Sequence, residues 1–128
     1  MMGPTGLLFV LSLPRAPSNA ADTAGSPTAP VTVQLWMDYQ SPDSVPIAKE
    51  LEPELRTRVG KGLIQVAQKD LALLGEESVT ASVAVRCIAD QDGPAWLMHD
   101  VLAVNAEAAG SGIYTTDVML RVASQLGV

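Results

Sequence analysis

Two serines, Ser41 and Ser44, lie three residues apart with Pro-Asp between them and are the first candidates for chemistry. A serine hydroxyl becomes a nucleophile when a general base takes its proton, and His99 is the one histidine of the chain. Neither serine stands in a G-x-S-x-G sequence, the strained turn that exposes the nucleophile of many hydrolases. The sequence therefore disfavours a Ser-His hydrolase, and we expect His99 to pack or to cap at a helix surface.

Asp38 and Asp43 are the carboxylates beside these serines, and together they could act as a general acid and a general base. A carboxylate near the start of a helix is more often solvated, so this alternative stays secondary. The sequence His99-Asp100 resembles that of metal-dependent phosphohydrolases only superficially, because those enzymes need several more His and Asp ligands. One cysteine and one histidine cannot build a Cys/His zinc site, so the sequence predicts no metal and no cofactor.

Composition limits the remaining classes of function. The chain has 128 residues, 48% of them hydrophobic, which suffices for one domain with a core. A net charge of −6, no basic stripe and only 4% aromatic residues disfavour nucleic acid as a partner. The single cysteine, Cys87, cannot form an internal disulfide. We expect it to be a small buried hydrophobe on a helix face, with an intermolecular disulfide as the alternative.

The first 30 residues are predicted to lie outside the folded domain. An apolar run over residues 6–13 is followed by small residues at 18–20, where a signal peptidase would cleave, so we expect export to the periplasm or cell envelope. No Lys or Arg precedes the run, which is too short to span a bilayer. Residues 14–30 are rich in Pro, Ala, Ser and Thr and are predicted to be an unstructured linker. The folded domain is therefore predicted to span residues 31–128.

Hydrophobic periodicity predicts a strand, a helix and a second strand at the start of this domain. Alternating apolar residues over 31–37 are typical of a strand, and residues 63–68 predict another. Between them an apolar stripe predicts a helix, and its members are Ala48, Leu51, Leu55 and Val59. Pro53 should kink this helix because it lacks an N–H. Such a strand-helix-strand unit implies two parallel strands.

Three further helices are predicted over about residues 76–128. Ser78 is the expected cap of the first helix, and its predicted core-facing stripe consists of Val79, Val83 and Cys87. The second helix begins after Gly93-Pro94, and the third after Thr115 or Thr116. We expect both tryptophans in the core, at domain boundaries.

The serine pair also has a purely structural interpretation, as the start of a helix. Ser41 suits the N-cap, where a side-chain oxygen accepts a hydrogen bond from a first-turn N–H. Pro42 suits the first helical position, and Asp43 complements the positive end of the helix dipole. We prefer this interpretation, which requires no activity of Ser41 or Ser44.

The order of elements and the local sequence together resemble the DsbA-like branch of the thioredoxin superfamily. VTVQLWMDYQSPDS resembles the first strand of that family running into its Cys-Pro-x-Cys active site, and LEPEL resembles its kinked first helix. ASVAVRCIADQ and AWLMHDVL are similar to its inserted helical domain, and TTDVMLRVASQLGV to the helix that closes it. The resemblance implies an α/β thioredoxin-like fold with a helical insertion over about residues 76–128.

Two departures from this family bear on function. Ser41 and Ser44 stand at the positions of its two cysteines, and Asp38 stands where an acidic residue is common in the family. Thiol–disulfide exchange needs a thiolate, so the family's oxidoreductase activity should be absent. The sequence also stops before the family's cis-proline loop, β-hairpin and final helix, so we expect a partial domain.

The sequence therefore predicts a redox-inactive DsbA-like domain that binds or scaffolds polypeptides, since the resemblance implies a peptide-holding groove beside the helix start. The alternative is a fragment of a DsbA-type thiol–disulfide oxidoreductase without activity of its own, and an active oxidoreductase is a third possibility. The expected partner is an extracytoplasmic polypeptide. Two parallel strands with unpaired edges also predict self-association.

Overall fold

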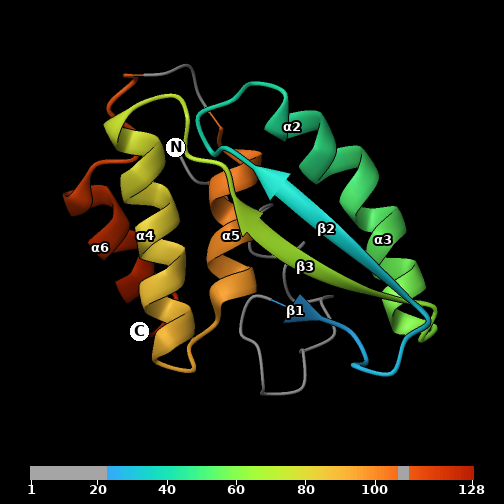
Figure 1. Ribbon diagram of the computed structural model, residues 1–128. Helices are drawn as coiled ribbons and strands as arrows, with labels where there is room; N and C mark the ends of the chain where they lie inside the picture. Colours follow the sequence, from blue (N-terminus) through green and yellow to red (C-terminus); the bar gives the residue numbers. More distant parts are fainter. Residues whose placement is uncertain (1–22, 107–109) are drawn as a thin grey trace.

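The computed structural model describes residues 23–106 and 110–128, and the predicted export segment lies outside these residues. Its sheet has three strands in the order β1-β3-β2 (Figure 1). They are β1 (Thr23–Ala24), β2 (Val31–Met37) and β3 (Ile64–Asp70). β2 and β3 are parallel, with Val31 opposite Ile64 and Met37 opposite Asp70. The predicted parallel pair is thus confirmed.

The short strand β1 lies within the segment that was predicted to be an unstructured linker, and for these two residues that prediction is wrong. Thr23 and Ala24 pair antiparallel with β3, and Ala24 is buried. Gly25 follows with φ +105°, and a Cβ there would lie 2.8 Å from the carbonyl oxygen of Ile64. Small residues without much apolar surface can still pair by their backbones, which a composition argument does not detect.

The helix predicted between the parallel strands is irregular. It begins as α2 (Ser44–Pro46), passes through the π-helical turn η1 (Ile47–Leu51) and continues as α3 (Glu52–Gly60). Pro53 lies in the first turn of α3 and offers no N–H to the carbonyl one turn earlier. A π-helical turn commonly accommodates such a missing hydrogen bond, and here it lies directly before the position where the sequence predicted a kink.

Three helices follow the sheet, as predicted: α4 (Glu76–Asp90), α5 (Ala95–Val104) and α6 (Thr116–Gln125). Figure 1 shows them to the left of β2 and β3 in this view and α2 and α3 to the right, and α5 meets α3 on one face of the sheet, where His99 lies 3.0 Å from Glu52. α5 is the central helix, since it contacts α4, α2 and η1, and seven of its ten residues are buried. Thr115 caps α6 by accepting from the N–H of Val118 at 3.4 Å, which confirms one of the two predicted caps. Within the described residues no helix is long and apolar enough to span a bilayer.

The buried face of α4 is not the predicted one. Val79 and Val83 are 50% and 52% exposed, and Cys87 is exposed as well. The residues of α4 that pack against the core are Ser78, Ala81, Ser82, Val85 and Ile88. This face combines Ala81, Val85 and Ile88 with two serines, and the Ser78 hydroxyl donates to Asp38, so tertiary contacts bury it and leave Val79 and Val83 outside. Trp36, expected in the core, is 53% exposed at the end of β2.

Candidate functional site

Asp38 organises the carboxyl end of the sheet, directly after β2. Its carboxylate accepts four hydrogen bonds, from the Ser78 hydroxyl at 2.6 Å and from the backbone N–H groups of Gln40, Leu73 and Leu74 at 2.8 to 3.0 Å. Burial alone would raise the pKa of Asp38, but these hydrogen bonds outweigh it and lower the pKa below the usual value. The carboxylate is therefore ionised and buried, and it ties the segment after β3 to the end of β2. The sequence singled out Asp38 without predicting this role.

The five residues that follow β3, 71–75, form what we call the leucine loop. Two of its N–H groups are held by Asp38, and a third, that of Leu71, donates to the carbonyl of Met37 at 3.1 Å. Its three leucines are exposed, and Leu73 is exposed to 74%. Gly75 then turns the chain into α4 with φ +119°, a conformation that L side chains rarely adopt. The backbone of the loop is fixed while its apolar side chains face solvent.

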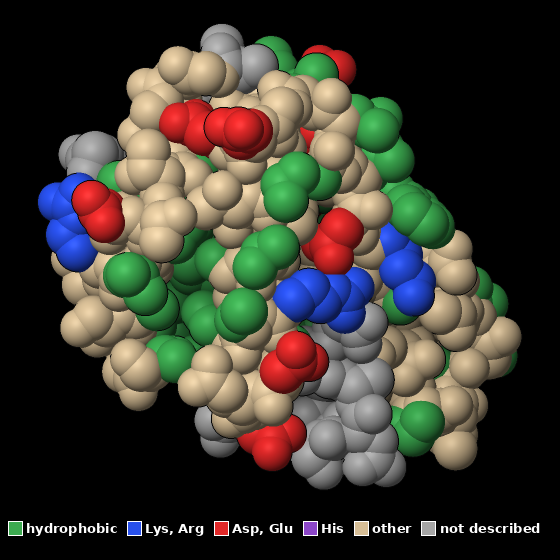
Figure 2. All heavy atoms as spheres, turned by 60° about the vertical axis from the view of Figure 1, so that its left-hand side comes forward, with side chains coloured by type: hydrophobic (Ala, Val, Ile, Leu, Met, Phe, Trp, Pro, Cys, Tyr) green, Lys and Arg blue, Asp and Glu red, His purple; other side chains and the backbone are tan. Residues whose placement is uncertain are grey.

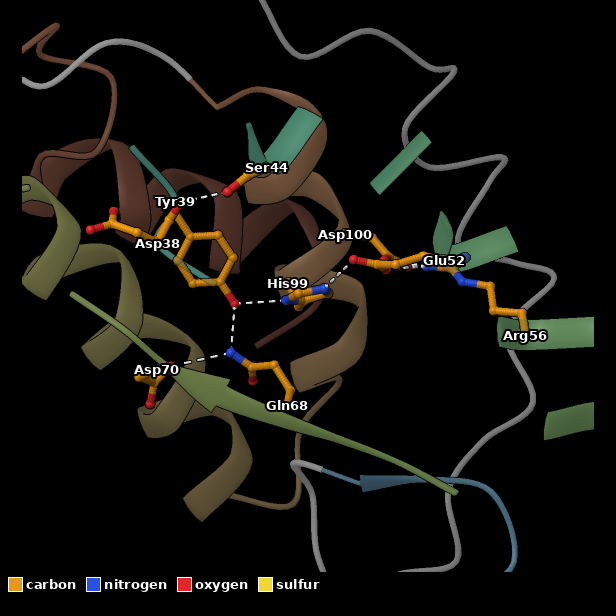
Figure 3. Close-up of polar contacts among 9 residues, drawn as sticks. All are labelled: Asp38, Tyr39, Ser44, Glu52, Arg56, Gln68, Asp70, His99 and Asp100. Atoms are coloured by element: carbon orange, nitrogen blue, oxygen red, sulfur yellow. Dashed lines mark hydrogen bonds and ion pairs between the residues drawn. The ribbon is translucent and has the colours of Figure 1, made fainter. Parts of the chain in front are cut away.

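Ser44 makes the side-chain hydrogen bond at this junction, and Ser41, the predicted cap, does not. Ser44 is buried, and its hydroxyl donates to the backbone carbonyl of Asp38 at 2.6 Å (Figure 3). Ser41 is partly exposed, and its side chain makes no hydrogen bond within the described residues. The residue before α2 is Asp43, in a helical conformation and without a side-chain cap. The predicted N-cap at Ser41 is therefore wrong, because a helical Asp43 moves the start of the helix to Ser44.

The two residues between the serines lie at the surface. Pro42 and Asp43 are exposed, and the carbonyl of Pro42 accepts from the N–H of Val45 at 3.3 Å. Neither of the two disfavoured chemical pairings, Asp38 with Asp43 and a serine with His99, is formed. Asp38 is buried among its hydrogen-bond donors while Asp43 is exposed, and His99 makes no hydrogen bond to either serine among the described residues.

A second polar cluster, the buried ion network, lies between the sheet and helices α3 and α5 (Figure 3). His99 is fully buried, with Nδ1 2.8 Å from the Tyr39 hydroxyl and Nε2 donating to Glu52 Oε1 at 3.0 Å. Gln68 donates to the same hydroxyl at 2.9 Å. Arg56 contacts both Glu52, at 3.3 Å, and Asp100. Of the two roles predicted for His99, packing holds and capping at a helix surface does not, since α5 is buried on nearly all sides.

The charges of the buried ion network depend on one another. Burial disfavours the charged form of His99, but the hydrogen bond and charge of Glu52 outweigh burial and raise its pKa. Burial is likewise outweighed at Glu52, where His99 and then Arg56 lower the pKa. At Asp100 burial prevails and raises the pKa to about 7, although His99 and Arg56 oppose it. Its Oδ2 is buried without a hydrogen-bond partner in the described chain, as a carboxyl that is partly protonated at neutral pH would allow.

Three of these residues could in principle hold a metal ion, because Glu52, His99 and Asp100 offer ligand atoms within 4.8 Å of one another. The guanidinium of Arg56 already contacts both carboxylates and supplies the positive charge that an ion would bring. His99 Nε2 is engaged with Glu52 as well. The donor set therefore fits an ion-pair network better than a metal centre, and we assign no metal to it.

Sequence reasoning missed Glu52, although a signal for it exists. Glu52 lies four residues after Ala48 and seven before Val59, so it shares the buried face of the helix with both. Leu51, which the predicted stripe included, is exposed instead. A carboxylate on an apolar helix face indicates a buried partner, and here the partners come from α5 and from the next turn of α3.

A small cavity adjoins the buried ion network between α3 and the sheet. Its volume is about 20 Å³, which holds roughly one water molecule and no organic cofactor. The lining residues are Ala24, Leu35, Glu52, Leu55, Arg56, Val59, Val66 and Trp96.

Comparisons with known proteins agree with this architecture. The family model described as thioredoxin matches residues 18–119. Among solved structures, oxidised BdbD from Bacillus subtilis has a similar fold, with a TM-score of 0.75 and 21% identity over 82% of this chain. The thiol-disulfide exchange protein alpha-DsbA2 from Wolbachia pipientis has a TM-score of 0.66 and 14% identity over 98% of this chain. The chain spans 58% of the first of these proteins and 66% of the second, and no curated protein matches it.

Proposed function

Because this chain belongs to the thioredoxin family, with a DsbA-like fold, we propose that it is a redox-inactive domain that binds polypeptides at the carboxyl end of its sheet. The observation that carries the proposal is the leucine loop, whose backbone is fixed by Asp38 while Leu73 is exposed to 74%. Burying an exposed leucine contributes about 1.5 to 3 kcal/mol. A fixed loop loses little conformational entropy on binding, so most of that contribution would appear as affinity.

Redox chemistry is not available to the chain through the family's route. Ser41 and Ser44 stand where the family carries two thiols, and the single cysteine, Cys87, lies on α4. A lone thiol can form mixed disulfides but cannot complete dithiol exchange. We therefore expect no turnover in an insulin reduction assay. Replacing both serines by cysteine in one variant should create a reactive pair, and turnover by the unmodified chain would contradict the proposal.

Binding can be measured with a permanently unfolded polypeptide, fluorescein-labelled α-lactalbumin that has been reduced and carboxymethylated. Fluorescence anisotropy should show saturable binding to the chain. Leu73→Ser should weaken it about tenfold, because one buried apolar side chain is lost from the complex. The matched control is Leu120→Ser, which removes a leucine exposed to 65% on α6 and should leave the affinity unchanged. No binding by the wild type, or equal effects of the two substitutions, would overturn the proposal.

Self-association through β2 is a second proposal, favoured by a different observation. β2 is the outer strand of the described sheet, and its exposed residues include Val31 and Trp36. An unpaired strand edge can pair with the same edge of another copy. Trp36→Lys should lower the proportion of dimer seen by size-exclusion chromatography with light scattering. A wild-type monomer at all concentrations would contradict this second proposal.

We also propose that the protein is exported. The apolar run at residues 6–13 and the small residues at 18–20 support export, although both lie outside the described residues. Two alternatives for function remain, a piece of a DsbA-type thiol–disulfide oxidoreductase without activity of its own and an active oxidoreductase. The first predicts that the chain fails the polypeptide-binding assay, and the second predicts turnover in the insulin assay.

A further inference from the structure

Resting on the proposed function, we infer that the segment bound at the leucine loop is apolar and flanked by basic residues. The apolar centre follows from the three exposed leucines, and the basic flanks follow from the charges that surround them.

Acidic side chains follow the leucine loop directly. Glu76 and Glu77 form the first turn of α4, directly after the loop. Glu76 is exposed, and Glu77 accepts from the Gln40 side chain at 3.0 Å and from the N–H of Gly112 at 3.2 Å. Asp43, five residues after Asp38, lies exposed directly before α2 and is a further acid on the chain that leaves this end of the sheet.

The nearest basic residues before and after the leucine loop in sequence are Lys69 and Arg86. Arg86 donates from Nε to Asp70 at 2.9 Å, so it balances a carboxylate of β3. Lys69 lies opposite Trp36 in the register of β2 and β3. Because side chains alternate along a strand, Lys69 lies on the face of the sheet opposite to that of Gln68 and Asp70. The positive end of the α4 dipole amounts to about half a charge, which is less than the two carboxylates of its first turn carry.

The surface view supports the same distribution. Figure 2 shows acidic side chains on the upper part of this face away from Lys and Arg, whereas the Lys and Arg side chains in its middle and at its left margin lie beside acidic ones. The net charge of −6 adds long-range attraction for a cationic segment. An apolar segment with acidic flanks would bring like charges together, and like charges at an interface disfavour binding.

Two synthetic peptides with the same apolar centre, one flanked by lysines and one by glutamates, test this inference. In fluorescence anisotropy at low salt, the Lys-flanked peptide should bind about tenfold more tightly, and the ratio should shrink at high salt because screening shortens the range of the charges. Leu73→Ser should weaken binding of both peptides.

The charge dependence can be assigned to residues with a matched pair of double variants. Asp43→Asn with Glu76→Gln removes the exposed acid before α2 and the exposed acid directly after the leucine loop, and should lower the affinity ratio about fivefold. Glu50→Gln with Glu54→Gln removes two exposed acids of η1 and α3, changes the net charge equally and should leave the ratio nearly unchanged.

The outcomes separate the inference from the proposed function. If both peptides bind equally well and Leu73→Ser weakens both, the basic flanks are wrong and polypeptide binding stands. An equal response to the two double variants would also overturn the inference, because the attraction would then come from net charge alone. If neither peptide binds, the proposed function fails and the inference fails with it.

Discussion

The Asp38 site and the buried ion network are both built from ionised groups, but they differ in what those groups contact. In the buried ion network the charged groups of Glu52, His99 and Arg56 face the interior and contact one another. The Asp38 carboxylate instead accepts hydrogen bonds from the backbone of the leucine loop, and Leu73 is thereby held in solvent. We infer that the network serves stability, whereas the Asp38 site positions a binding surface. Substitutions in the two regions should therefore affect different measurements.

The largest effect is expected from Glu52→Ala in the buried ion network. Removing this carboxylate leaves His99 and Arg56 without their shared partner, which should lower the free energy of unfolding by about 3 to 5 kcal/mol. Glu54→Ala is the control on the same helix, because the Glu54–Arg58 pair is exposed and 3.9 Å long, and it should change stability little. Urea unfolding of both variants measures the difference. Equal losses would show that the network does not stabilise the fold.

The pH dependence of stability should follow the same network. The folded-state pKa values of Asp100, about 7, and of His99 are raised, so their stabilisation is present at low pH and is lost as pH rises through those values. The chain should therefore unfold at a higher urea concentration at about pH 5 than at about pH 8. Asp38 and Glu52 have lowered values, so stability should fall again below about pH 4. Asp100→Asn should flatten the change between pH 5 and pH 8. An unchanged slope in that variant would contradict the assignment.

The two serines offer a smaller test at the Asp38 site. Ser44→Ala removes the buried donor to the Asp38 carbonyl and should cost about 1 kcal/mol of unfolding free energy. Ser41→Ala should cost only a few tenths, because that side chain makes no hydrogen bond in the described residues. Denaturant unfolding of the two variants compares them directly. A larger cost at Ser41 would restore the N-cap that the sequence predicted there.

The smallest expected effect on stability belongs to the leucine loop itself. Leu73→Ser changes a side chain exposed to 74% and should shift the free energy of unfolding by less than about 0.5 kcal/mol. The same substitution is expected to weaken polypeptide binding. Thermal unfolding of this variant and of Glu52→Ala would compare the contributions of the two regions to stability. A marked loss of stability from Leu73→Ser would contradict the distinction between them.

The sequence predicted the parallel strands and the order of helices because hydrophobic period and turn residues are local signals. The structure confirms β2, β3 and the cap at Thr115. Local signals fail where the partner lies far along the chain. The exposed face of α4 was predicted to be its core face because valines pack more often than serines, whereas contacts with Asp38, α5 and α6 bury the face that carries Ser78, Val85 and Ile88.

The candidate site shows the same division between local and distant information. Ser41, Ser44 and Asp38 were identified from their spacing, but the buried role of Ser44 depends on a carbonyl six residues earlier. Asp38 depends on partners 35 to 40 residues away, and Glu52 on His99, 47 residues away. Such pairings are set by the tertiary fold, so they cannot be predicted from the local spacing of residues in one sequence.

Chemical-shift mapping tests the location of the binding surface most directly. Reduced and carboxymethylated α-lactalbumin would be titrated into the ¹⁵N-labelled chain, and amide shifts would be followed in two-dimensional NMR spectra. The account predicts shift changes concentrated in the leucine loop and the first turns of α4, with little change at His99 and its neighbours in α5. Changes centred on the buried ion network or on β2, with the leucine loop unaffected, would contradict it.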